Sequence, residues 1–186
     1  MTITPDTKDW TWVLERACSE CGLDSASVAR EQLPDMLRAN AEQWRQVLAG
    51  PGDVRRRPRP DVWSPLEYAC HVRDVCRVFS GRLDLMRTQD DPAFPNWDQD
   101  ATAVADRYGE QDPAVVSDEL VAAARHLADG FAAVPPADWA RTGTRSDGAV
   151  FTIESFGRYF IHDVIHHIYD VTGRPAGGDA SPSPGA

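Results

Sequence analysis

The stretch FGRYFIHDVIHHIYDVT, residues 156–172, decides the fold of this chain and holds most of its chemistry. Its apolar residues recur at helical spacing, so we predict a helix with one buried side. On a helical wheel of about 100° per residue, that side centres near Val164, Ile168 and Val171. Such a helix must be covered by other elements on its apolar side, as happens in a helical bundle.

Polar residues in the same stretch form two i,i+4 pairs. Asp163 and His167 lie on the edge of the buried side and point partly inward, whereas His162 and His166 lie further round, toward the polar face. A carboxylate and an imidazole at a buried edge must be satisfied there. A metal ion shared with another helix would satisfy both.

Three further helices are predicted from apolar periodicity. The first covers residues 26–49 and should kink or restart at Pro34. The second covers residues 65–87, where Ser64 is the N-cap of a capping box. The third begins at Asp112-Pro113 and ends before Pro135. With the helix capped by Thr152 and no convincing alternating strands, the fold class is all-α, a four-helix bundle.

The domain organisation follows from these elements. We expect an irregular N-terminal arm over residues 1–25, the bundle over residues 26–174 and a tail of disordered composition over residues 175–186. The long connection at residues 89–111 is predicted to lie over a site. Residues 137–151 form a turn-rich connector with a tight turn at Ser146-Asp147-Gly148.

Composition narrows the function classes. A chain of 186 residues fits one domain, and its net charge of −10 argues against nucleic acid or an anionic membrane as a partner. We find no apolar run of about 20 residues and no secretory signal at the N-terminus. The 4 cysteines do not form a disulfide framework, so we expect a reduced, cytoplasmic protein.

The candidate metal centre combines His71, on the flank of the second helix, with Asp163 and His167. These residues supply three nitrogen or oxygen ligands, the number typical of a catalytic site with an open position. Zinc is the first expectation, and nickel, iron(II) and manganese suit the same ligands. The alternative is a buried hydrogen-bond network that fixes helix register.

The remaining polar residues have less specific roles. His162 and His166 are expected at the surface or behind the ligands, or as an alternative ligand pair, and Asp170 is expected to orient a ligating imidazole. Cys18-x2-Cys21 lacks the second ligand pair of a structural zinc site, so we interpret these residues as two local thiols.

The motifs resemble those of the DinB-like superfamily. They are Trp63-Ser-Pro-Leu-Glu-Tyr-Ala-Cys-His71 and His162-Asp-Val-Ile-His166-His167-Ile-Tyr-Asp170. That superfamily includes mycothiol-dependent maleylpyruvate isomerases and the bacillithiol and mycothiol S-transferases. The resemblance implies a divalent metal held by His71, Asp163 and His167. Asp163 stands where relatives have His or Glu, which leaves His162 and His166 as an alternative pair.

The implied function is that of a metal-dependent thiol S-transferase or isomerase acting on a small electrophile. A low-molecular-weight thiol of the mycothiol type would be the cosubstrate, and Asp163 and Asp170 would move protons. The alternative is a non-catalytic bundle that binds a metal or a small ligand. The aromatic residues Trp10, Trp12 and Trp97 add apolar surface that is compatible with a homodimer.

Overall fold

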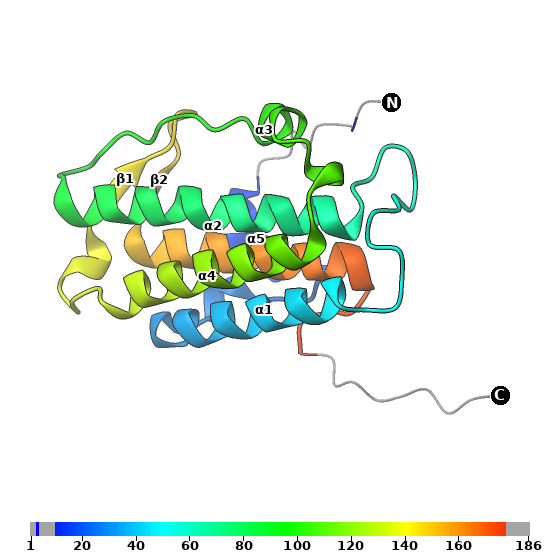
Figure 1. Ribbon diagram of the computed structural model, residues 1–186. Helices are drawn as coiled ribbons and strands as arrows, with labels where there is room; N and C mark the ends of the chain where they lie inside the picture. Colours follow the sequence, from blue (N-terminus) through cyan, green and yellow to red (C-terminus); the bar gives the residue numbers. More distant parts are fainter. Residues whose placement is uncertain (1–2, 4–9, 178–186) are drawn as a thin grey trace.

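A computed structural model describes residue 3 and residues 10–177. Four long helices run side by side as a bundle (Figure 1). They are α1 (Leu33–Leu48), α2 (Pro65–Thr88), α4 (Pro113–Ala132) and α5 (Ile153–Thr172), and a short helix, α3 (Gln99–Ala105), lies in the connection between α2 and α4. The predicted all-α four-helix bundle is confirmed.

Local sequence fixes where α2 and α5 begin. The Ser64 side chain accepts a hydrogen bond from the Glu67 backbone N–H, and the Glu67 carboxylate accepts one from the Ser64 N–H at 2.8 Å. Thr152 caps α5 in the same way, together with Ser155. Gly173 ends α5 with a φ of +67°, a left-handed conformation that suits glycine. The predicted starts of both helices are confirmed.

The first helix is shorter than the sequence predicted. Two 3₁₀ turns, Ser25–Ser27 and Arg30–Gln32, precede α1, which begins only at Leu33. Pro34 therefore lies in the first turn of the helix, where its missing N–H costs nothing. The expected start at residue 26 was wrong, whereas the expected restart at Pro34 agrees with the beginning of α1 at Leu33.

The connector before α5 contains two strands that the sequence analysis did not predict. Strands β1 (Thr142–Thr144) and β2 (Val150–Thr152) pair antiparallel. The predicted tight turn joins them, and the Gly148 N–H donates to the Arg145 carbonyl at 2.8 Å. Each strand has 3 residues, too few to produce a detectable alternating pattern.

The hairpin anchors the long connection that follows α2. The Phe94 backbone N–H donates to the Thr144 carbonyl at 2.8 Å. A Cβ at Gly143 would lie only 2.5 Å from the Phe94 ring, so this close approach requires glycine. The connection then passes over α2 toward α3 (Figure 1), which places Trp97 against His71 of α2.

The N-terminal arm, in the part from residue 10 onward that the structure describes, packs on α5. A 3₁₀ turn, Thr11–Leu14, lies against α5, and Trp10 contacts the rings of His162 and His166. Val13 is fully buried there. The arm therefore covers a side of α5 that the other long helices leave open.

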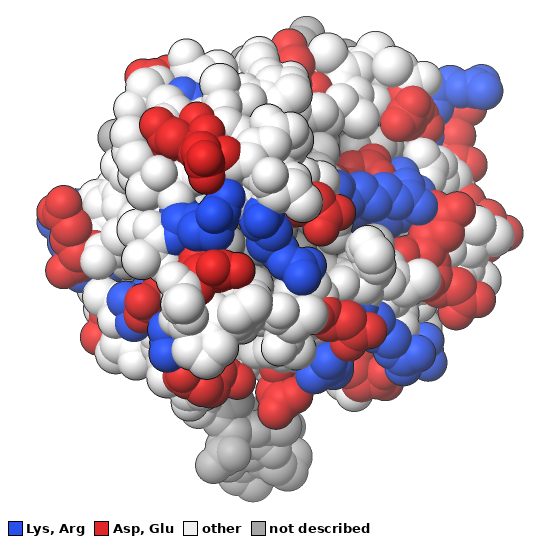
Figure 2. All heavy atoms as spheres, turned by 90° about the vertical axis from the view of Figure 1, so that its left-hand side faces the viewer, with Lys and Arg blue, Asp and Glu red and all other residues white. Residues whose placement is uncertain are grey.

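Charged residues are mixed on the end of the bundle that carries the hairpin. Figure 2 shows this face, where basic and acidic side chains alternate without a large area of one sign. In the described part of the chain, no helix combines the length and apolar character needed to cross a membrane.

Candidate functional site

The three residues predicted as metal ligands lie together between α2 and α5. One ligand atom from each of His71, Asp163 and His167 falls within 4.8 Å of the others. His71 is buried, and Asp163 and His167 are half-buried. The arrangement fits one shared ion, although ligation itself stays a prediction.

His71 is held among aromatic rings. Its imidazole stacks on Trp97 at a centroid distance of 5.6 Å and lies 5.1 Å from Trp63, while the His167 ring meets it edge-on at 4.9 Å. Burial, and then the nearby His167 ring, lower the pKa of His71 well below its ordinary value. The imidazole is therefore neutral, as metal ligation requires.

The Nδ1 atom of His71 indicates that these residues suit a metal. The Nδ1 atom of His71 is buried and has no hydrogen-bond partner among the described residues. A buried polar nitrogen without a partner is costly, and a function commonly explains it. Because the cluster gathers imidazole and carboxylate groups around this buried ring, its residues suit a divalent metal.

Asp170 orients His167 toward the cluster. The distance from His167 Nδ1 to Asp170 Oδ2 is 2.9 Å, so Nδ1 donates to the carboxylate, and in the neutral ring Nε2 carries the lone pair. The Nε2 atom faces Asp163, whose Oδ1 lies 3.7 Å away. A carboxylate behind a histidine in this manner fixes the ring and its tautomer.

Two cavities meet at this cluster. A cavity of about 300 Å³ is lined by His71 and Asp163, and a larger one of about 550 Å³ is lined by Asp163, His167 and Asp170. Both are also lined by Trp97 and Tyr159. A metal in the cluster would therefore be reachable from two sides.

The smaller cavity combines apolar walls with two arginines. Four phenylalanines line it: Phe79, Phe94, Phe151 and Phe156. Arg145 pairs with Asp147, whereas Arg82 forms no ion pair with any described residue and donates only to the Pro95 carbonyl, at 3.2 Å. Burial, and then Arg145, lower the pKa of Arg82 from its ordinary value. The sequence analysis missed Arg82 because nothing in its spacing marks it.

The second histidine pair is buried, so the surface position that the sequence favoured was wrong, while the alternative of a ligand pair stays a prediction. His162 and His166 are buried, not on a polar face, because the N-terminal arm covers their side of α5. They lie beside Cys18 and Cys21, which are also buried. Burial, and then His166 and His167, lower the pKa of His162 to about 4. The second ligand pair that Cys18-x2-Cys21 lacked in sequence is thus present in space.

Comparisons with known proteins agree with this fold. One solved structure that resembles the chain is YfiT from Bacillus subtilis, described as "a probable metal-dependent hydrolase with an unusual four-helix bundle topology". The TM-score is 0.71 at 19% sequence identity, and the match covers 79% of this chain and 87% of YfiT. No curated protein matches the chain.

A family model settles the classification. The model of the DinB superfamily matches residues 31–171, which include α1, α2, α4 and α5 and with them all three residues of the candidate metal centre. The match extends over well more than half of the chain, from just before the first long helix to the last turn of the final one. The chain therefore belongs to the DinB superfamily.

Proposed function

We propose that this protein is a divalent-metal-dependent enzyme that transfers a low-molecular-weight thiol to a small electrophile, or uses the thiol to isomerise it. The observation that carries the proposal is the His71, Asp163 and His167 cluster at the junction of two cavities. Three protein ligands leave a coordination position for substrate. Thiol-dependent transferases and isomerases among DinB-like proteins support the choice of reaction.

A metal bound there supplies a Lewis acid that favours loss of the thiol proton. Asp163 lines both cavities and lies within the cluster, so its carboxylate is the group in reach of that proton. Asp170 lines only the larger cavity and acts by holding His167 through Nδ1. In the reaction the thiol S–H bond breaks and its proton passes to a carboxylate, while the sulfur bonds to a carbon of the electrophile as a C=C π bond opens or a leaving group departs with its bonding electrons. The carboxylate then returns the proton to the carbon at the other end of the opened bond or to the leaving group, and in an isomerisation the sulfur–carbon bond breaks again to release the thiol.

The smaller cavity suits the electrophile. Its phenylalanine walls would contact an apolar or unsaturated body, and Arg82 would pair with an anionic group. The Arg82 guanidinium is half-buried and lies 5.5 Å from the ring centroids of Phe79 and Phe94. A desolvated cation without a carboxylate partner gains from an incoming anion.

The larger cavity suits the thiol. Carboxylates dominate its polar lining, and they belong to Glu20, Asp61, Asp98, Asp100, Asp163 and Asp170. Such a lining accepts hydrogen bonds from hydroxyl groups and repels anions. We therefore expect a neutral, hydroxyl-rich thiol such as mycothiol to be preferred over an anionic thiol such as glutathione.

The test is thiol consumption in the presence of a panel of small electrophiles. Activity should vanish after chelation, return with added zinc or another divalent metal, and be absent in His71→Ala. Arg82→Gln should raise KM about 10–100-fold for an anionic electrophile, the value of one charge-assisted hydrogen bond, and leave KM for a neutral one unchanged. Arg87→Gln, on the same helix but paired with Asp84, is the matched control.

The description of YfiT favours a second candidate, metal-dependent hydrolysis. In that case water rather than a thiol would use the open position, and Asp163 would again take the proton. Ester or amide turnover without any thiol would support hydrolysis and contradict the transferase proposal. Metal binding without turnover in either assay would leave a non-catalytic metal-binding bundle.

A further inference from the structure

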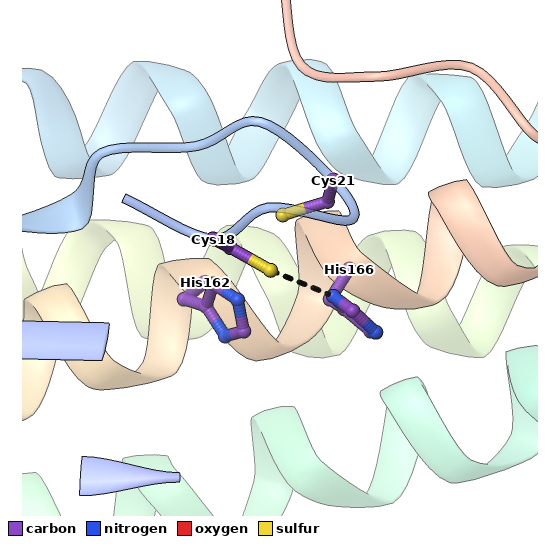
Figure 3. Close-up of side chains that lie close together, drawn as sticks. All are labelled: Cys18, Cys21, His162 and His166. Atoms are coloured by element: carbon purple, nitrogen blue, oxygen red, sulfur yellow. Dashed lines mark hydrogen bonds between the residues drawn. The ribbon is translucent and has the colours of Figure 1, made fainter. Parts of the chain in front are cut away.

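A second cluster of metal-ligating side chains lies on the other side of α5. Cys18 and Cys21 come from the N-terminal arm, and His162 and His166 project from α5 toward them (Figure 3). One ligand atom from each of the four residues lies within 4.8 Å of the others. The four residues are at most 7% exposed, so they form a buried centre and not a surface group.

The spacing within this cluster matches a tetrahedral site. With Zn–S of about 2.3 Å and Zn–N of about 2.0–2.1 Å, a tetrahedral angle separates a sulfur ligand from a nitrogen ligand by about 3.5–3.6 Å. The distance from Cys18 Sγ to His166 Nδ1 is 3.7 Å. The pair therefore already stands near the separation that zinc would impose.

The histidines are supported as zinc ligands usually are. His166 directs Nδ1 to Cys18, and its Nε2 lies 3.3 Å from a Glu20 oxygen and 3.5 Å from Asp170 Oδ1. Carboxylates behind a ligating imidazole orient the ring and strengthen the ligand. The Nε2 atom of His162 is buried and has no hydrogen-bond partner among the described residues, which leaves that imidazole unsatisfied without an ion.

The backbone around the thiols is a tight loop that aims both sulfurs to one side. The Cys18 N–H donates to the Leu23 carbonyl and the Gly22 N–H to the Cys18 carbonyl, each at 2.9 Å. Gly22 has a φ of +77°, which glycine adopts without strain. The chain beyond α5 holds this loop in place, because the Ala176 N–H donates to the Cys21 carbonyl.

We propose that Cys18, Cys21, His162 and His166 form a second metal site, a structural zinc site that fastens the N-terminal arm to α5. Two thiolates and two imidazoles in a buried, four-ligand arrangement are typical of structural zinc, and leave no position for substrate. A Cys18–Cys21 disulfide is the main competitor, but the two thiols are free in this structure, and the Cys18 sulfur points to His166 (Figure 3).

The site would stabilise the wall of the neighbouring cavity. Trp10, Glu20, His162 and His166 all line the larger cavity beside the His71 cluster. Over residues 10–25, which the structure describes, the arm has no helix longer than a 3₁₀ turn, so a metal is a strong source of order for it. Removing the ion should therefore loosen the arm before it unfolds the bundle.

The decisive measurement uses the wild-type chain loaded with cobalt(II) in place of zinc. Thiolate ligation gives a sulfur-to-cobalt charge-transfer absorption in the near ultraviolet, which imidazole and carboxylate ligands do not give. We expect this band in the wild type and in His71→Ala, and its loss in Cys18→Ser/Cys21→Ser. The absence of the band in folded wild-type protein would overturn the proposal. A Cys18–Cys21 disulfide would also overturn it, and would be detected as the loss of two hydrogens from the intact mass of protein kept under a non-chelating reductant.

Metal stoichiometry separates this site from the proposed active site. The wild type should hold two metal ions per chain, whereas His71→Ala and the double cysteine variant should each hold one. Cys76→Ala, which removes a buried thiol outside the cluster, is the matched control and should hold two. Proteolysis of the arm should quicken in Cys18→Ser/Cys21→Ser and stay unchanged in His71→Ala. If the wild type shows the cobalt band but has no activity, the enzyme proposal is refuted and the zinc-site proposal stands.

Discussion

Gly157 sets how closely α5 approaches its neighbours, and replacing it with alanine should cancel or outweigh the stability that alanine otherwise adds to a helix. A Cβ at this position would lie 2.5 Å from Leu33 Cδ1 of α1 and 3.2 Å from Phe131 Cε1 of α4. Carbon atoms in contact normally stand about 3.5–4.0 Å apart, so Leu33 would have to move by about 1 Å. Leu33 is only 2% exposed and has little room to do so.

The magnitude follows from two opposing terms. Glycine to alanine in a helix interior gains about 1 kcal/mol in helix propensity, and overpacking a core costs about 1–3 kcal/mol. Gly81 is the matched control, because it lies in α2 and a Cβ there meets nothing within 4 Å. Gly81→Ala should therefore raise the free energy of unfolding by about 1 kcal/mol. The free energy of unfolding of Gly157→Ala should be lower than that of Gly81→Ala by the overpacking cost of about 1–3 kcal/mol.

Urea and thermal denaturation followed by circular dichroism would measure the difference. Each kcal/mol corresponds to about 2–4 °C in Tm for a chain of this size. Combining Gly157→Ala with Leu33→Val, which shortens the obstructing side chain, should cost less than the sum of the two single changes. If Gly157→Ala stabilised as much as Gly81→Ala, the inferred contact between α5 and α1 would be wrong.

Three further predictions concern the site, acid stability and assembly. Asp170→Asn should weaken metal binding at the His71 cluster by about 10–100-fold in a chelator competition, whereas Asp84→Asn on exposed α2 surface should leave it unchanged. Burial alone would raise the pKa of Asp74, but hydrogen bonds from Arg73 and Tyr108 outweigh it and lower that pKa. The stability that Asp74 contributes is therefore present above its ordinary pKa of about 4 and is lost as the pH falls below it. In urea denaturation at decreasing pH, the midpoint of Asp74→Asn should therefore fall less steeply below a pH of about 4 than that of the wild type. The homodimer expected from composition should appear in sedimentation at tens of micromolar, and a monomer there would contradict it.

The helical periodicity of the sequence predicted the bundle and one of the two clusters. The capping box at Ser64 and the apolar stripe of residues 156–172 define the starts and faces of α2 and α5. Those two helices alone bring His71 to Asp163 and His167. Where a site depends only on regular helices, the pattern of side chains is enough to locate it.

The second cluster could not be located in this way. The helical wheel assumes one buried side, and it placed His162 and His166 toward solvent. The arm that buries them has no periodic pattern, so its path over α5 depends on tertiary contacts such as those of Trp10. The sequence features that could have indicated this cluster are the Cys18-x2-Cys21 pair and the i,i+4 pair of His162 and His166, which the first cluster does not use. Two of the aromatic residues that suggested a dimer also have contacts within the chain, where Trp10 covers this side of α5 and Trp97 covers His71.

The register of α5 divides its polar residues between the two clusters. The pair His162/His166 and the pair Asp163/His167 differ by one residue, which turns them about 100° apart on the helix. Asp170 contacts one histidine of each pair. Its Oδ2 atom lies 2.9 Å from His167 Nδ1, and its Oδ1 atom lies 3.5 Å from His166 Nε2. One carboxylate therefore supports a ligand of the candidate active site and a ligand of the proposed zinc site. Because both contacts come from the same side chain, loss of the arm should disturb His167 even though the arm holds no ligand of that cluster.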